Sequence, residues 1–376
     1  MEDAASDELR RVLYGPDAPP DVPVLLGWGF LTLLPDRASQ GEYQKLLKDV
    51  ESHLISGVGA PPRALALRDS ATPFDARVFL RGNPNRLGEP APRQFLSAVN
   101  PGAAPFQEGS GRLELAREIA HASNPLTARV MVNRLWLHHF GAGIVRTPGD
   151  FGLRGEPPTH PELLDYLAGE FVRDGWSMKM LHRRLATSAV FRQASGERPE
   201  PLAIDPENRL WWRMNARRLE FEPLRDAMLA VADSLDRRLG GPSINLLGDA
   251  VVPRRTLYGF IDRLDVPPLL TTFDFPSPAQ SSPQRDQTTV PPQALFMMNN
   301  GFVGEVAKRI AQHPALAATP SPADRAQRLF ELLYGRAATM AEQERVLAFA
   351  ADPTIAAPWE RIVHALLMAN EFLFID

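Results

Sequence analysis

The chain has 376 residues, with 41 lysines and arginines against 45 aspartates and glutamates, a formal net charge of −4 and no cysteine. The lack of cysteine excludes disulfides, thiolate metal sites, iron–sulfur ligation, covalent haem attachment and a cysteine nucleophile. The slightly negative charge argues against nucleic-acid binding, which depends on a strongly cationic face.

One apolar stretch, residues 22–35, is the strongest candidate for a membrane or export segment. It is shorter than the roughly 20 apolar residues that span a bilayer, and Pro23, Gly27 and Gly29 interrupt it. The residues before it are acidic (Glu2, Asp3, Asp7 and Glu8), where a signal peptide carries positive charge. We therefore expect a buried apolar segment, no membrane span and no export signal in this chain.

The first third of the chain predicts few regular elements. Apolar spacing indicates a helix over 42–55, followed by a proline-rich connector. An alternating run over 77–81 predicts a short strand, which the Gly-Asn-Pro turn at 82–84 ends. We expect residues 84–110, which are punctuated by proline and glycine, to be irregular.

Helix boundary signals are clear beyond residue 111. The Asn-Pro pair at 124–125 predicts the start of a helix and Gly141 its end. Thr159 and Glu162 have the spacing of a capping box, so a second helix is expected from there to Gly175.

The rest of the chain predicts mostly helices. Ser177 is expected to cap one helix, a second to cover 205–212, and a third to span 219–239. Residues 256–261 alternate like a short strand, and 264–292 are predicted to be a long proline-rich loop. Four further helices are expected at 292–312, 322–334, 340–351 and 356–373. The sequence thus predicts a mainly α, irregular multi-helix domain with one or two short β-strand pairs.

Polar residues on the helix after Pro125 are the first candidate site. Arg134 and His138 are four residues apart and therefore share a face, with Asn133 on an adjoining one. This cluster either meets a ligand in a groove between helices or is a buried network in which Arg134 binds loop carbonyls. His138, Asp150 and His160 are the residues from which a divalent metal site could be built, but their spacing matches no compact motif, and we predict no metal.

A hydrolytic site would need paired carboxylates or an activated serine. Asp150, Glu156 and Asp165 are close in sequence, yet capping and solvation also explain them. No nucleophile elbow, phosphate loop or dinucleotide fingerprint occurs in the sequence. Whether the protein is an enzyme therefore stays open.

The proline-rich loop carries a second candidate site. Arg285, Asp286 and the threonines at 288–289 precede a predicted helix start, where backbone N–H groups attract anions. The alternative is an Arg–Asp ion pair that fixes the loop, with a threonine capping the helix. Nearby aromatic residues either pack the loop onto the helices or offer a stacking platform for a sugar: Trp211, Trp212, Phe273 and Phe275.

Several motifs carry a family resemblance. They lie at 124–136, 138–141, 143–152, 155–164, 175–177, 191–193, 205–209, 272–276, 285–286, 288–295 and 370–373. With them, residues 75–376 resemble the C-terminal domain of unknown function of planctomycete and verrucomicrobial proteins that also carry a planctomycete-type cytochrome c domain.

The resemblance implies an exported, multidomain protein with a haem-binding Cys-x-x-Cys-His module upstream. We expect residues 1–74 to be the remnant of such a module and 75–376 to be the family domain. Because this chain has no cysteine, haem is expected only on an upstream or partner cytochrome domain, and this chain is expected to hold no cofactor. The implied location is extracytoplasmic, in the periplasm or at the cell surface.

Two functions remain open. The first is a helical accessory or interaction domain of a cytochrome-linked protein, without catalytic activity, whose partner is a cytochrome c-like domain. The alternative is a ligand-binding or hydrolytic domain for an anionic or polysaccharide substrate. That alternative requires one concave site between the helix pair at 125–160 and the loop at 264–292, with its polar residues gathered there: Arg134, His138, His160, Arg285 and Asp286.

Overall fold

The computed structural model describes residues 37–56, 66–246, 251–319 and 321–375. The apolar stretch 22–35 and the acidic residues before it lie outside these described residues. In the described ranges, no helix combines the length and apolar character that crossing a bilayer requires. The chain divides into two compact units, Met1–Phe74 and Asp75–Asp376.

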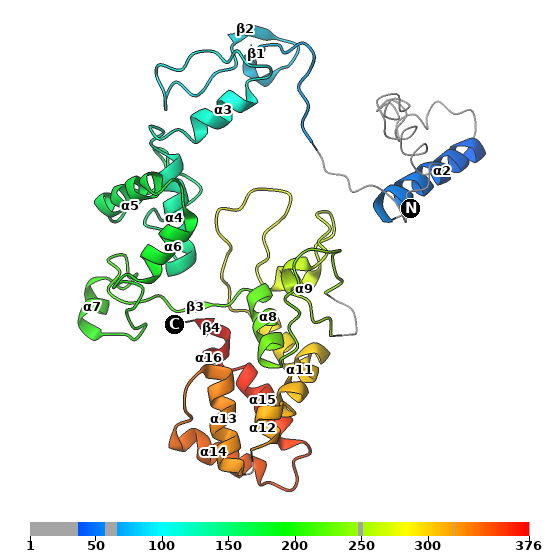
Figure 1. Cartoon of the computed structure of the whole chain (residues 1–376), viewed down its shortest axis with the longest axis vertical. Coiled ribbons are helices and arrows are strands. Elements are labelled where there is room, and N and C mark those ends of the chain that lie inside the picture. The colour runs from blue at the N-terminus through cyan, green and yellow to red at the C-terminus, as the bar shows by residue number, and fades with distance from the viewer. Residues whose placement is uncertain (1–36, 57–65, 247–250, 320, 376) are drawn as a thin grey trace, which may run out of the picture. The chain divides into compact units, whose positions relative to one another are not determined.

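The fold is mainly helical, as predicted (Figure 1). The described residues form 15 α-helices and two short antiparallel strand pairs. In the first unit they form α2 (Arg37–Ser56), which covers the predicted helix at 42–55 and starts one turn earlier. The expected irregular multi-helix architecture is therefore confirmed.

The second unit opens with a hairpin. β1 (Ala76–Phe79) pairs antiparallel with β2 (Leu87–Ala91), and α3 (Arg112–Ile119) follows. The first strand was expected, but the prediction of irregular structure over 84–110 is wrong at β2. A glycine and Pro90 weaken its strand signal, and Pro90 is tolerated because this sheet has two strands and therefore only edges.

Three helices enclose the first hydrophobic core: α4 (Thr127–Phe140), α5 (Pro161–Arg173) and α6 (Met178–Ala186). They carry the labels α4, α5 and α6 in Figure 1. Each turns one apolar face inward, which removes large side chains from water. Members of this core include Val132, Phe140, Ile144, Leu164, Phe171, Leu181 and Leu185.

Two of the predicted boundary signals around this core are confirmed, and a third is shifted by two residues. Gly141 ends α4 in the left-handed region at φ 80°, where a side chain would be strained. The N-cap of α4 is Leu126 rather than Asn124, but the amide oxygen of Asn124 accepts hydrogen bonds from the N–H groups of Leu126 and Thr127, where α4 begins. Ser177 caps α6 by accepting a hydrogen bond from the N–H of Met180.

The predicted capping box at the start of α5 is wrong. The hydroxyl of Thr159 donates to the carbonyl of Ile144 at 3.3 Å, and its backbone N–H donates to the same oxygen at 2.9 Å. His160 is the N-cap instead, without a side-chain bond to the helix. A tertiary contact has thus replaced the local cap.

A second core is built mainly from α8 (Phe221–Val231), α11 (Gly301–Ala311), α13 (Pro322–Tyr334) and α15 (Pro358–Leu367). Smaller elements surround it: η4 (Thr256–Tyr258), α9 (Pro268–Thr272), α10 (Pro291–Asn299), α12 (Pro314–Ala317), α14 (Met340–Ala350) and α16 (Asn370–Leu373). The last strand, β4 (Phe374–Ile375), pairs antiparallel with β3 (Arg217–Arg218).

The helix predicted over 205–212 does not form. The carboxylate of Asp205 accepts hydrogen bonds from the N–H groups of Arg209 at 2.9 Å and Leu210 at 2.7 Å, which folds the segment into turns. A short helix, α7 (Pro199–Ile204), lies before it instead. Asp205 therefore ends a helix rather than starting one.

Other predicted boundaries also shift. The helix expected over 219–239 ends at Val231, where Asp233 takes a φ of 50°. Residues 256–261 contain the 3₁₀ turn η4 rather than a strand, and the long loop contains α9.

Two of the last four predicted helices are interrupted. The helix expected over 292–312 divides at Asn300, whose side chain accepts from the N–H of Phe302 and starts α11. The helix expected over 356–373 divides into α15 and α16.

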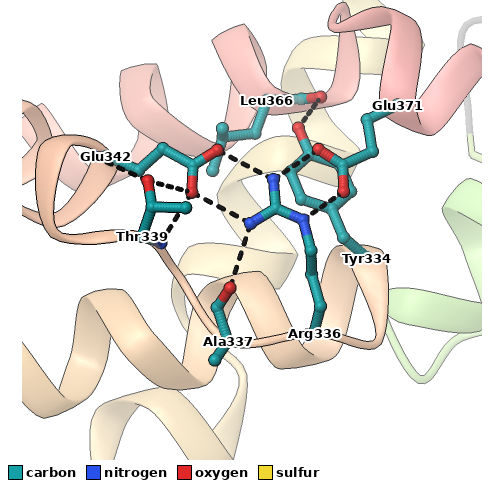
Figure 2. Close-up of polar contacts among 7 residues, drawn as sticks. All are labelled: Tyr334, Arg336, Ala337, Thr339, Glu342, Leu366 and Glu371. Atoms are coloured by element: carbon teal, nitrogen blue, oxygen red, sulfur yellow. Dashed lines mark hydrogen bonds and ion pairs between the residues drawn. The ribbon is translucent and has the colours of Figure 1, made fainter.

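An arginine network fastens the C-terminal helices together (Figure 2). The Arg336 guanidinium binds Glu342 at 2.8 Å and Glu371 at 2.5 Å. Glu342 also completes a capping box with Thr339 at the start of α14. The Arg336 hydrogen bond, followed by the bond from Thr339, lowers the pKa of Glu342 to about 2.

Candidate functional site

A cleft of about 290 Å³ lies beside α4 in the second unit. One wall is α4, a second is the segment that carries β3, and the third is the loop at 276–287. The lining residues are Arg134, Leu137, His138, Gly141, Arg217, Glu220, Pro276, Ser282, Pro283, Gln284, Arg285 and Gln287. Arg134, His138 and Arg285 therefore share one concave site, whereas His160 and Asp286, which the ligand-binding alternative also requires, do not line it.

The sequence of α4 explains which residues face this cleft. Arg134 and His138 are one turn apart on the exposed face, while the opposite face belongs to the first core. Asn133 is fully buried and does not line the cleft. Its Nδ2 donates to the carbonyl of Val145 at 3.1 Å, and its Oδ1 accepts from the Val145 N–H at 2.8 Å. Asn133 thus holds the loop after α4 in place.

The cations of the cleft are arranged around a neutral imidazole. Burial lowers the pKa of His138 below its ordinary value of 6.5, and the charges of Arg134 and Arg217 lower it further. The carboxylate of Glu220 acts in the opposite direction. His138 is therefore uncharged at neutral pH and presents either a donor or an acceptor nitrogen.

Two of the arginines differ in how they are held. Arg217 donates to the backbone carbonyl of His138, and burial lowers its pKa. The side chain of Arg134 is exposed and, among the described residues, makes no hydrogen bond or ion pair. Arg134 is thus the guanidinium that is free to bind a ligand.

Arg285 is paired, but not with its neighbour Asp286. Its two terminal nitrogens bind the carboxylate of Glu222 at 2.9 and 2.8 Å, and Glu220 lies 3.3 Å away. The hydrogen bonds that Arg285 donates to Glu222 raise the pKa of Arg285. This ion pair fixes the loop against the start of α8, and Asp286 lines a small adjoining pocket.

Thr288, the first of the two threonines after Asp286, is engaged by a carboxylate. The backbone N–H and the hydroxyl of Thr288 donate to the carboxylate of Asp274 at 2.9 and 2.7 Å. The N-cap of α10 is Val290, so the expectation that Thr288 or Thr289 caps this helix is wrong.

Asp150 and His160 lie outside the cleft. Asp150 accepts from the N–H of Gly152 at 2.8 Å, and the Nδ1 of His160 is hydrogen-bonded to Thr159 at 3.0 Å. In the part of the chain that the structure describes, no three His, Cys, Asp or Glu side chains are grouped so that they could hold a metal ion. His138, Asp150 and His160 therefore do not form a metal site there.

The carboxylates considered for hydrolysis are engaged elsewhere. Glu156 pairs with Arg209 at 2.9 Å, and Asp165 pairs with Arg129 at 2.6 Å. Among the residues that line the cleft, Glu220 is the single carboxylate. The cleft thus lacks the carboxylate pair of a glycoside hydrolase.

The aromatic residues mostly pack the interior. Trp211 and Phe273 are buried in the two cores. Trp212 lies beneath Arg198 and Arg213, and the ring of Phe275 lies 5.1 Å below the Arg285 guanidinium. These contacts account for the aromatic residues without a sugar-stacking surface.

Sequence reasoning missed several residues that complete the cleft. Arg217 and Glu220 come from the segment between the two cores, and Gln284 and Gln287 come from the loop. The adjacent arginines at 217–218 were the one feature of the sequence that could have pointed to this site. No neighbouring residue indicated that they would contact α4.

Comparison with known proteins gives a family but no activity. A family described as PSD1, protein of unknown function (DUF1553), matches residues 111–350. The chain belongs to this family. No curated protein and no solved structure matches the chain. All elements that line the cleft lie within the matched PSD1 residues, and the expected domain of unknown function is confirmed.

Proposed function

We propose that the PSD1 domain of this chain binds an anionic ligand in the cleft beside α4. The observation that carries the proposal is the presence of Arg134, Arg217 and Arg285 around one concave site, with Arg134 unpaired among the described residues. Guanidinium groups bind carboxylates and sulfates with two parallel hydrogen bonds, which suits them to such ligands.

The ligand class that fits best is a uronic or sulfated glycan. Ser282, Gln284 and Gln287 line the same cleft and supply neutral donors and acceptors of the kind that recognise sugar hydroxyls. The neutral His138 adds one more such group. A ligand that combines one anionic group with several hydroxyls would use both sets of side chains.

The proposed activity is binding rather than hydrolysis by two carboxylates. Glu220 is shared with Arg285 and has no second carboxylate beside it among the lining residues. A binding domain needs the positioned cations alone, which this cleft provides.

The test is isothermal titration calorimetry with an oligogalacturonate, a sulfated oligosaccharide and an uncharged cello-oligosaccharide. Binding of a charged oligosaccharide, weakened about tenfold in Arg134→Gln, supports the proposal, because a hydrogen bond to a charged group is lost. Arg183→Gln is the matched control, since Arg183 is an exposed arginine of α6 outside the cleft. Equal binding of the uncharged sugar, or no binding at all, would contradict it.

A second candidate function is an accessory domain in an extracytoplasmic, cytochrome-linked assembly. It is favoured by the segment from β1 to α3, in which Phe95 is the one buried hydrophobic side chain among the described residues 75–126. Val78, Phe79 and Leu87 are each 51 % exposed, and an apolar surface of this kind often marks a protein contact. The partner would be a cytochrome c-like domain that carries the haem.

This candidate is tested by co-expression with the product of a neighbouring haem-bearing reading frame. Co-purification detected by haem absorbance, and lost in Phe79→Asp, supports the interaction. Co-purification that Phe79→Asp leaves intact, or no haem protein bound, would count against it.

A further inference from the structure

A second pocket lies at the C-terminal end of the second unit, between α10 and the last elements of the chain. Its volume is about 320 Å³. Most of its lining is apolar, from Val290, Ala294, Met297, Met298, Met368, Leu373 and Phe374. None of its lining residues lines the cleft beside α4, so this site is separate from the proposed anion site.

One cation faces this apolar surface. Strand pairing places Arg218 opposite Phe374, so its side chain lines the pocket at the edge of the small β3–β4 sheet. Its Nη1 donates to the carbonyl of Thr288 at 3.1 Å and to the side chain of Gln293. These contacts fix the guanidinium beside the pocket.

The charge of Arg218 is poorly compensated. Its Nε is buried and has no hydrogen-bond acceptor in the ranges that the structure describes. Its guanidinium forms no ion pair with a carboxylate of those ranges, and its guanidinium carbon lies 5.6 Å above the Phe273 ring. Arg218 is partly buried, and the carboxylate of Asp274 partly compensates its charge without a direct ion pair. A carboxylate bound directly to the guanidinium would therefore stabilise it.

We propose that this pocket binds a medium-chain carboxylate, with its carboxylate at Arg218 and its chain along Met297, Met298 and Met368. Methionine side chains are flexible and polarisable, and they adapt to an alkyl chain. The volume is at the lower end of the range of small-molecule pockets, roughly 300–1,000 Å³, which suits a short chain rather than a long lipid. The inference does not depend on the function proposed for the other cleft.

The test uses octanoate, with 1-octanol as the uncharged probe of the same chain length. In protein labelled on methionine methyl groups, octanoate is expected to shift the signals of Met297, Met298 and Met368 among the ten methionines of the chain. Calorimetry is expected to give at least tenfold tighter binding for octanoate than for octanol. Arg218→Gln should remove that difference, and Arg218→Lys should keep part of it.

Pocket filling supplies an independent variant if Arg218→Gln does not fold. Ala294→Phe places a ring in the pocket and is expected to abolish octanoate binding, whereas Leu295→Phe, on an exposed residue outside the lining, should leave it intact. Equal binding of octanoate and octanol, methyl shifts elsewhere, or no binding would overturn the proposal. A concentration-dependent dimer that Ala294→Phe dissociates would instead show that a second copy covers the pocket.

Discussion

Arg217 donates a hydrogen bond from its guanidinium to the backbone carbonyl of His138, across 79 positions of the chain. That carbonyl belongs to the last turn of α4, where the helix has no partners of its own for its C=O groups. Asn215 adds a second such bond, from its Nδ2 to the carbonyl of Phe140 at 2.9 Å. The segment 215–217, which leads into β3, thus caps α4 and brings a cation into the cleft by the same contacts.

The charge around His138 should be measurable directly. Since the positive charge of Arg134 disfavours the imidazolium, Arg134→Gln is expected to raise the pKa of His138 toward its ordinary value of 6.5. An NMR titration of the histidine ring protons measures this. Arg183→Gln should leave the pKa unchanged, and an equal shift in both variants would contradict the assigned geometry.

Acid should weaken the network of Arg336 in a defined pH range. The pKa of Glu342 is about 2 in the folded protein against an ordinary value of 4.5, so its contribution to stability is complete above pH 4.5 and is lost as the pH falls toward 2. Glu342→Gln is therefore expected to lower the free energy of unfolding by up to about 1 kcal/mol at pH 7, because the neutral amide keeps the capping box but weakens the contact with Arg336. Urea titrations at pH 7 and pH 3 should show this difference shrinking; a constant difference would refute the role of the carboxylate.

The loop after α4 should depend on Asn133. Asn133→Ala leaves the N–H and C=O of Val145 buried without partners, which is expected to cost about 2–4 kcal/mol. Chemical unfolding followed by circular dichroism measures the loss. Asn299→Ala, on an exposed residue of α10, should change stability by less than about 0.5 kcal/mol. Similar effects of both substitutions would show that the Asn133 contacts contribute nothing.

Replacing either of two glycines with alanine is expected to change the stability of the protein, in opposite directions at the two positions. A Cβ at Gly143 would lie 2.4 Å from the carbonyl oxygen of Val145 and 2.7 Å from Asn133, so Gly143→Ala must displace backbone and should destabilise the protein. A Cβ at Gly169, inside α5, would meet nothing within 4 Å. Gly169→Ala is therefore expected to stabilise by about 0.5–1 kcal/mol. Melting temperatures of the two variants measure both effects. A stabilising Gly143→Ala would contradict the close packing of the loop.

What the sequence could predict were features with a local cause. Ser177 and Gly141 act through backbone groups within a few residues, so their roles follow from capping chemistry alone. The shared face of Arg134 and His138 follows from helical spacing in the same way.

What it could not predict were contacts between distant segments. Thr159 has the local chemistry of a cap, but the carbonyl of Ile144 competes successfully for its hydroxyl. Arg285 binds Glu222, 63 residues away, rather than the neighbouring Asp286, because the loop packs on α8. Arg217 likewise reaches the cleft through a tertiary contact with α4. No periodicity in the sequence predicts contacts between segments this far apart.

The family match and the folded body end at different places. PSD1 similarity stops at residue 350, yet Val363 and Leu367 of α15 are fully buried against the helices before it, and β4 completes the sheet with β3. A recombinant protein trimmed to the family limits would therefore expose the interior of its C-terminal half to solvent. Expression of this domain in soluble form should require the chain through to at least Ile375.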